Sequence, residues 1–299
     1  MDIESLRDTL CGLSVTTATP FTSDLKHIDT SGLVGNLEYL SREGVKFLVP
    51  CGNTGEFYSL SEQEWREVFD ATVSSVGSDV TIMPGVGHSV GTAIDQMEYA
   101  KNAGAQMVMV MYPQHVFRSE EGLLDYCTRI LEAADGIGVV LYKKGPLLTD
   151  AVFSKILKYK HLIGAKYAFG RIADFARTVH SVGDSLAWSC GTAERFAPFF
   201  WLAGARGFTS GLGNFAPKVS LKMYDALQAG DYDEAMRIQR MIEPLEFIRE
   251  RNEKSWNVPV IKSGLDHVGL VGGDCRPPIH TLTMADHDEI HSLISKWDL

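Results

Sequence analysis

Residues 162–169 read Leu-Ile-Gly-Ala-Lys-Tyr-Ala-Phe, and their apolar character predicts a buried β-strand. The lysine in this stretch, Lys166, is the exception to that character. Burying an unpaired ammonium group is so costly that such a lysine usually loses its proton or finds a special partner. A neutral amine in an apolar pocket is a nucleophile towards carbonyl carbon. Lys166 is therefore either a catalytic lysine that forms a Schiff base or a structural lysine held by a carboxylate. From this residue alone, the structural alternative is somewhat favoured.

The stretch belongs to a repeating pattern of strands and helices. Short runs rich in Val, Ile and Phe predict seven further strands, at residues 13–19, 46–51, 80–86, 106–111, 137–142, 186–190 and 207–210. Helical spacing between them predicts helices at residues 62–74, 92–102, 121–134, 150–158 and 172–182. Repeated strand–helix units over roughly 200–250 residues are typical of an α/β protein with a (β/α)8 TIM barrel. A doubly wound open sheet also alternates, but it rarely needs so many units.

The last part of the chain has a different pattern. Helical spacing recurs at residues 218–228, 233–252, 258–268 and 286–297, with no strand between them. We therefore expect a barrel over residues 1–217 and a C-terminal helical extension over residues 218–299. No linker or low-complexity segment separates the two, so the extension is expected to pack on the barrel as part of one structural unit.

Composition excludes several classes of partner. The 299 residues include 28 Lys and Arg against 38 Asp and Glu, which gives a net charge of −10. This balance argues against nucleic acid or an anionic membrane as a partner. No apolar run is long enough to span a membrane, and no signal peptide is visible. The five cysteines are scattered without a CxxC pair, so we expect a reduced, cytoplasmic setting.

Three polar features follow predicted strands, at the end of a barrel where active sites lie. The first is the turn at residues 52–56, Gly-Asn-Thr-Gly-Glu, whose backbone N–H groups suit a carboxylate or an oxyanion. The second is Tyr142, which could fill the core or move protons. The third is Lys166. All three are expected to face one active-site mouth, although a glycine-rich turn alone is weak evidence.

Together these motifs resemble those of the dihydrodipicolinate synthase / N-acetylneuraminate lyase superfamily. The turn at residues 52–56 resembles its G-x-T-G-E motif, Leu141-Tyr142 its strand-five tyrosine, and Gly164-Ala165-Lys166 its G-x-K lysine. The order and spacing match from about residue 13 to about residue 278. Three linked motifs in the correct order are specific, whereas any one alone is not.

The resemblance implies a Schiff-base lyase or aldolase that acts on pyruvate or a longer 2-oxo acid. Lys166 would attack the C2 carbonyl and Tyr142 would relay protons. Thr54, with Gly52, Asn53 and neighbouring backbone N–H groups, would hold the C1 carboxylate. The resemblance implies no metal and no organic cofactor, and the scattered histidines show no ligand spacing. It also implies a homo-oligomer, either a homotetramer or a homodimer.

Several positions depart from the synthase branch of this superfamily. The arginine that follows the tyrosine in that branch is Leu147 here, and a second threonine of the first motif is Asn53. The interface tyrosine aligns with His115, and Tyr112 is the nearby alternative. Other stretches resemble the 5-dehydro-4-deoxyglucarate dehydratase branch, at residues 55–60, 192–194, 214–217 and 276–278. The Asn-Arg pair of that branch is Lys143-Lys144 here, which keeps charge but not the planar donor.

We therefore expect a lyase of the 5-dehydro-4-deoxyglucarate dehydratase type, with dehydration and aldol cleavage both open. Thr209, Ser210 and Asn214, near the end of the last strand, are candidates for binding substrate hydroxyls. Lys144 is a candidate for a distal carboxylate, although most lysines are simply exposed. Two alternatives remain: the synthase reaction of pyruvate with aspartate semialdehyde, and a barrel that binds a 2-oxo acid without turning it over. The retention of Lys166, Tyr142 and Thr54 together argues against the second.

Overall fold

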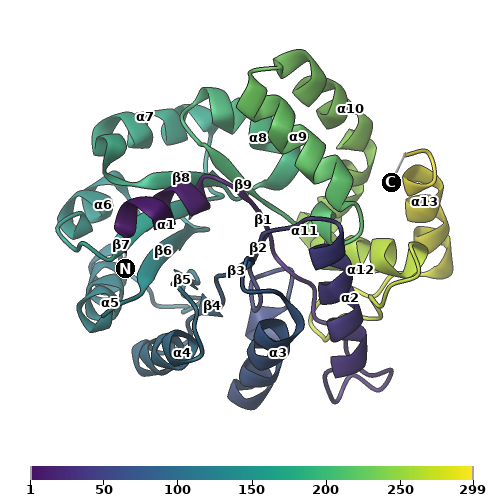
Figure 1. Cartoon of the computed structure of the whole chain (residues 1–299), viewed down its shortest axis with the longest axis horizontal. Coiled ribbons are helices and arrows are strands. Elements are labelled where there is room, and N and C mark those ends of the chain that lie inside the picture. Colours follow the sequence, from purple (N-terminus) through teal and green to yellow (C-terminus); the bar gives the residue numbers. More distant parts are fainter. Residues whose placement is uncertain (1, 298–299) are drawn as a thin grey trace. The chain divides into compact units, whose positions relative to one another are not determined.

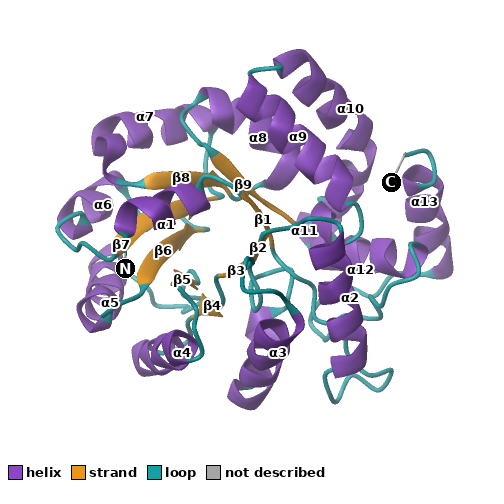
Figure 2. Cartoon of the chain, in the orientation of Figure 1, coloured by secondary structure: helices purple, strands orange, loops and turns teal. Residues whose placement is uncertain are grey.

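The computed structural model describes residues 2–297, whose helices and strands are labelled in Figure 1. The chain forms two compact units. The first contains Met1–Ser14 and Thr81–Thr209, and the second contains Val15–Val80 and Ser210–Leu299. Each unit contains helices and parallel strands, and Figure 2 shows the helices in purple and the strands in orange.

Five successive parallel pairings build the sheet of the first unit. Its strands in sequence order are β4 (Gly85–Val86), β5 (Met107–Val110), β6 (Gly138–Lys143), β7 (Leu162–Tyr167), β8 (Ala187–Cys190) and β9 (Gly207–Ser210), and each pairs with the next. Every residue of these strands is buried. Burial on both faces is expected of a parallel sheet covered by helices, and it explains the continuous apolar runs in the sequence.

The helices of this unit alternate with its strands. They are α1 (Ile3–Leu10), α4 (Val90–Asn102), α5 (Glu120–Ala133), α6 (Asp150–Ile156), α7 (Ile172–Val182), the 3-10 turn η2 (Gly183–Ser185) and α8 (Ala193–Leu202). Ser89, Ser119 and Thr149 each cap a helix by accepting a hydrogen bond from the backbone N–H three residues later. The predicted alternation of strands and helices is confirmed.

The second unit carries the C-terminal helices. Val15, the last residue of strand β1 (Leu13–Val15), lies opposite Leu48 of strand β2 (Phe47–Leu48) in a parallel pairing. The helices are α2 (Thr30–Arg42), η1 (Phe57–Ser59), α3 (Glu62–Ser75), η3 (Leu212–Asn214), α9 (Pro217–Ala229), α10 (Tyr232–Arg249), α11 (Arg251–Lys254), α12 (Asn257–His267) and α13 (Met284–Ile294). After β9 the described residues form helices and loops without a further strand, which confirms the predicted C-terminal helical region.

Some predicted elements differ in length or were missed. The predicted strand at residues 80–86 is two short strands, β3 (Thr81–Ile82) and β4, which are separated by Met83 and Pro84. Proline has no N–H to donate to a strand ladder, so the break is expected there. Helix α8 was not predicted, since Pro198 interrupts its pattern. No described helix is both long and apolar enough to cross a membrane.

Candidate active site

Lys166 and Tyr142 lie at the same level on adjacent strands of the first unit. The parallel register of β6 and β7 places Lys166 opposite Tyr142, and the register of β7 and β8 places it opposite Ser189. The Lys166 Nζ atom lies 4.7 Å from the centroid of the Tyr142 ring. Both residues are 4% exposed. The amine of Lys166 and the phenol of Tyr142 therefore lie next to each other within this unit.

The surroundings of Lys166 favour its neutral form. Burial, with a smaller contribution from the positive charge of Lys144, lowers the pKa of Lys166 from 10.5 to about 7, against an opposing effect of Cys190. A carboxylate partner would raise the pKa of a lysine. The lowered pKa leaves a large fraction of neutral amine near pH 7, which is the form that attacks a carbonyl carbon. This environment suits the catalytic alternative better than the structural one.

Gly191, which sequence analysis overlooked, makes room for the Lys166 side chain. It follows β8, and a Cβ atom added to it would lie 2.8 Å from Cγ of Lys166 and 2.8 Å from Cβ of Ala168. Glycine is therefore the residue that lets the lysine stem pass this point without displacement. A glycine directly after a predicted strand was the available signal, since such a glycine often marks a close approach.

The two lysines that follow Tyr142 differ in their surroundings. Lys143 lies opposite Tyr167 in register, is buried, and its Nζ atom donates a hydrogen bond to the Leu148 carbonyl. Burial lowers the pKa of Lys143 to about 8, although the negative charge of Asp150 opposes this. Through its hydrogen bond to the Leu148 carbonyl, Lys143 holds the loop that follows β6. Lys144, the predicted ligand for a distal carboxylate, is exposed, yet its charge acts on Lys166.

The influence of Lys144 gives a pH prediction. Since only a neutral amine attacks a carbonyl carbon, the rate at which Lys166 is trapped with pyruvate should rise with pH and reach half its maximum near pH 7. In Lys144→Met the cation that disfavours a charged Lys166 is gone, so the pKa and the midpoint should move to higher pH. The midpoint is measured from inactivation by pyruvate with cyanoborohydride across pH. An unmoved midpoint, matching that of the exposed-lysine control Lys160→Met, would contradict the prediction.

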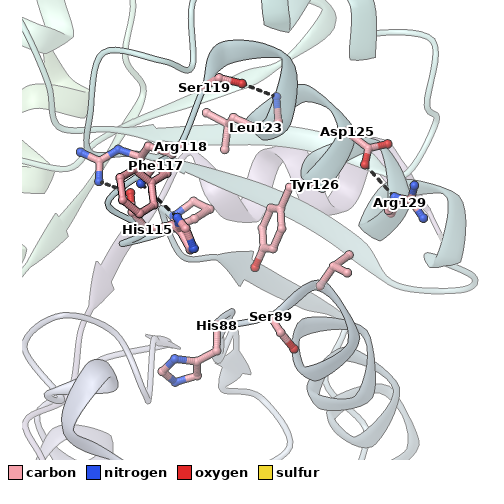
Figure 3. Close-up of a pocket in the computed structure, with 13 residues that line it drawn as sticks. His88, Ser89, His115, Phe117, Arg118, Ser119, Leu123, Asp125, Tyr126 and Arg129 are labelled. Carbon is pink, nitrogen blue, oxygen red and sulfur yellow. Dashed lines mark hydrogen bonds and ion pairs between the residues drawn. The ribbon is translucent and has the colours of Figure 1, made fainter.

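Tyr112 and His115, the two candidates for the interface tyrosine, occupy different places. Tyr112 is buried, and its hydroxyl accepts a hydrogen bond from the Leu147 N–H at 3.2 Å, so it also supports the loop after β6. His115 is exposed and lines a separate cavity of about 380 Å³ together with Phe117 and Tyr126 (Figure 3). The residues that line this cavity do not include Lys166 or Tyr142.

The motif at residues 52–56 forms a tight turn in the second unit. The Glu56 N–H donates to the Asn53 carbonyl at 3.1 Å, and the Phe57 N–H donates to the Gly52 carbonyl at 3.2 Å. Thr54 is buried within this turn. Gly55 accepts a hydrogen bond from the Thr19 hydroxyl at 2.9 Å, which holds the turn against the residues that follow β1.

The residues predicted near the last strand bind other protein groups. Asn214 donates to the carbonyls of Thr16 and Gly211, both at 2.8 Å, and accepts from the Ala18 N–H at 2.9 Å. The Ser210 hydroxyl accepts from the Gly213 N–H at 2.6 Å. In the first unit, Thr209 shares a hydrogen bond of 3.0 Å with the Ser14 hydroxyl. These contacts show how the segment after β9 is fixed.

Among residues 2–297, no group of three or more His, Cys, Asp or Glu side chains is arranged to hold a metal ion. The first unit brings a buried amine and a phenol together near the carboxyl ends of two parallel strands. Active sites of α/β barrels lie at this end of the parallel strands, and a neutral amine there is a nucleophile towards carbonyl carbon.

Comparison with known proteins identifies the family. The model of the dihydrodipicolinate synthetase family matches residues 9–297. A relative from Acinetobacter baumannii is named "Probable 5-dehydro-4-deoxyglucarate dehydratase" and is 32% identical to this chain. The matched region covers 89% of this chain and 88% of the relative. A "4-hydroxy-tetrahydrodipicolinate synthase" from Methanopyrus kandleri is 31% identical, with 87% of each chain covered. The crystal structure of dihydrodipicolinate synthase from Bacillus clausii is 36% identical, with a TM-score of 0.94 over 98% of this chain and 100% of that one.

The chain therefore belongs to the dihydrodipicolinate synthetase family, and it is an enzyme. The predicted membership is confirmed, including the similarity to proteins named as 5-dehydro-4-deoxyglucarate dehydratases.

Proposed function

We propose that this enzyme is a class I lyase, in which Lys166 forms a Schiff base with a 2-oxo acid. The observation that carries the proposal is the buried amine of Lys166, whose pKa is lowered to about 7, beside the ring of Tyr142. Membership of a family whose named relatives are synthases and dehydratases supports it. No metal or organic cofactor is part of the proposal.

The proposed reaction begins with attack of the neutral Lys166 amine on C2 of the substrate. Tyr142 carries the protons that turn the carbinolamine into an imine with loss of water. The imine makes the C3 proton acidic, and its removal gives an enamine that expels the C4 hydroxyl as water. Hydrolysis of the imine then releases the dehydrated product and restores the amine. If the C4 hydroxyl loses its proton instead, the C3–C4 bond breaks, which is aldol cleavage.

Substrate binding is proposed for further residues. Thr54, with Gly52, Asn53 and the backbone N–H groups of their turn, would hold the C1 carboxylate. Lys144 would bind a distal carboxylate, which fits its exposure and its electrostatic effect on Lys166. Thr209, Ser210 and Asn214 remain candidates for the substrate hydroxyls. His115 remains the candidate for the interface position.

The complete architecture is also a proposal. We infer a closed (β/α)8 barrel over residues 1–217 with a helical extension over residues 218–299, acting in the cytoplasm as a homodimer or homotetramer. The alternation of parallel strands and helices supports the barrel. So does the TM-score of 0.94 with a synthase structure that is covered in full.

A substrate panel tests the proposed activity. We expect turnover of 5-dehydro-4-deoxyglucarate and little condensation of pyruvate with aspartate semialdehyde, because Leu147 stands where the synthase branch has its arginine. Release of pyruvate would identify aldol cleavage, and its absence during substrate loss would identify dehydration. The similarity to the synthase from Methanopyrus kandleri makes the synthase reaction the second candidate for the function of this chain. Faster turnover of pyruvate with aspartate semialdehyde than of the sugar acid would make the synthase reaction the better candidate.

A further inference from the structure

A buried ion pair joins the C-terminal helices to the motif turn within the second unit. The Nζ atom of Lys262, in the middle of α12, lies 2.6 Å from Oε1 of Glu56, the last residue of the turn. Their side chains are 1% and 0% exposed. A buried ion pair is often no more stabilising than an apolar pair of the same size. Its best-attested role is to fix one arrangement of the chain.

The arrangement concerns the backbone of Glu56. This residue has φ 58° and ψ 39°, in the left-handed region that non-glycine residues rarely adopt. Its N–H closes the turn by donating to the Asn53 carbonyl, so Thr54 lies between the two hydrogen-bonded residues. Such a conformation persists where surrounding contacts hold it. The side chain of Glu56 supplies those contacts.

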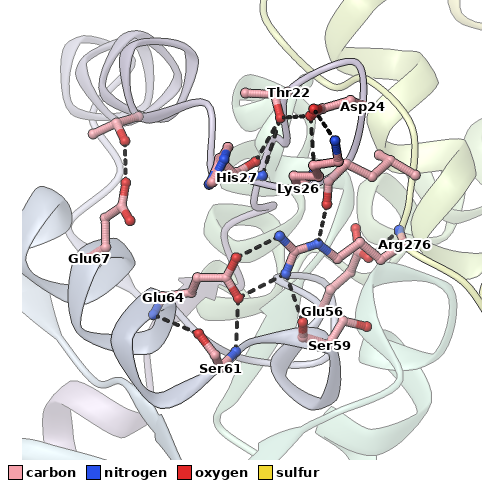
Figure 4. A network of polar contacts seen from close by, with 12 residues as sticks. Thr22, Asp24, Lys26, His27, Glu56, Ser59, Ser61, Glu64, Glu67 and Arg276 are labelled. Carbon is pink, nitrogen blue, oxygen red and sulfur yellow. Dashed lines mark hydrogen bonds and ion pairs between the residues drawn. The ribbon is translucent and has the colours of Figure 1, made fainter.

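Further contacts hold the same carboxylate and the same amine. Oε2 of Glu56 accepts a hydrogen bond from the Arg276 N–H at 2.9 Å, and Nζ of Lys262 donates to the Asp274 carbonyl at 2.9 Å. The Arg276 guanidinium in turn binds both carboxylate oxygens of Glu64, at 2.6 and 2.9 Å (Figure 4). Both cations lie over the Phe21 ring, at 4.5 and 4.1 Å from its centroid. The turn is therefore fixed from its last residue by the segment at residues 262–276.

We propose that Lys262 is a positioning residue, which acts through Glu56 to hold the turn of residues 52–56 so that Thr54 can bind the C1 carboxylate. This rests on the role proposed for Thr54. Lys262 itself does not contact the substrate. Loss of the ion pair lets the turn relax, which weakens substrate binding. The reactivity of Lys166 should be kept, since that residue takes no part in the contacts of Glu56 and Lys262 described above.

The test is the pyruvate dependence of imine trapping with cyanoborohydride. In Lys262→Met and in Glu56→Gln, the half-saturating pyruvate concentration should rise about tenfold, with the limiting rate within about twofold of the unmodified protein. Removing one partner of a buried pair leaves the other charge buried and unpaired, so either single variant can fail to fold. The double variant Glu56→Gln/Lys262→Met removes both charges and should stay folded. It should show the same rise.

Asn36→Ala is the matched control. Asn36 holds the same C-terminal segment through hydrogen bonds with the backbone of Val271, at 2.7 and 3.1 Å. Its loss lowers the melting temperature but should leave half-saturation within about twofold of the original value. Unchanged half-saturation in the double variant, or an equal rise in Asn36→Ala, would overturn the role of Lys262. Absence of trapping in the unmodified protein would instead remove the proposed function, and this inference with it.

Discussion

Replacing Lys166 with methionine is expected to lower turnover of any 2-oxo acid by about 10⁴-fold or more, because the variant has no amine to form the imine. Methionine fills a similar volume, so the buried site should remain packed. Turnover is measured under saturating substrate with the best compound of the panel. Lys160→Met, which removes an exposed lysine from the loop before β7, is the control and should keep full activity. Residual turnover within about tenfold of the unmodified protein would contradict a covalent role.

The same substitution should change how stability depends on pH. The pKa of Lys166 is about 7 in the folded protein and 10.5 as the ordinary value, so between these values the unfolded chain binds more protons. Stability of the unmodified protein should therefore gain up to about 1.4 kcal/mol per pH unit from this residue between roughly pH 7 and 10. Lys166→Met should lack this gain and be the more stable protein near pH 7. Denaturant unfolding at several pH values measures the difference between the two proteins.

Replacing Tyr142 with phenylalanine is expected to lower kcat/KM by about 10²–10³-fold, the range typical of losing a general acid–base group. The ring beside Lys166 is kept and only the hydroxyl is removed, so the buried amine should retain its packing. The rate of imine formation in a single turnover should fall with it. These rates are measured by rapid quenching with borohydride and mass spectrometry.

Tyr167→Phe is the matched control for Tyr142. Tyr167 is also a buried tyrosine next to Lys166 in sequence, but its ring packs on Phe175, 4.9 Å away between centroids, on the side of the strand that faces the helices. Its substitution should leave the single-turnover rate within about twofold. If both variants lose the same activity, Tyr142 contributes packing and not proton transfer.

The strands around Lys166 could be predicted because they are buried on both faces. Residues 162–169 read as one apolar run, and residues 162–167 of that run form β7. Helix α2 was missed because Gly32 and Gly35 lower its intrinsic helix propensity. Its stability comes from packing instead, through buried Leu33, Leu37 and Leu40 on one face. Such tertiary contacts are not visible in local sequence.

The sequence named the candidate site residues one by one, but it did not indicate the contacts that hold them in place. The motif pointed to Thr54, and the apolar surroundings pointed to Lys166. Lys262 lies in an apolar helical run as conspicuous as that of Lys166, yet its partner Glu56 is about 200 residues away in sequence. The left-handed backbone of Glu56 gave no signal either, because glutamate is not typical of that conformation. Ion pairs between residues far apart in sequence, and strained backbone conformations, become visible only in the three-dimensional structure.

Borohydride trapping with pyruvate, read by peptide mass spectrometry, tests the central claim most directly. We predict a reduced pyruvate adduct on the peptide that contains Lys166, with no adduct on Lys143 or Lys144 and none in Lys166→Met. Trapping should then extend to larger 2-oxo acids of the panel. An unmodified Lys166 after reduction with pyruvate and with those larger acids would contradict Schiff-base chemistry. It would leave a barrel that binds 2-oxo acids without turning them over as the better account.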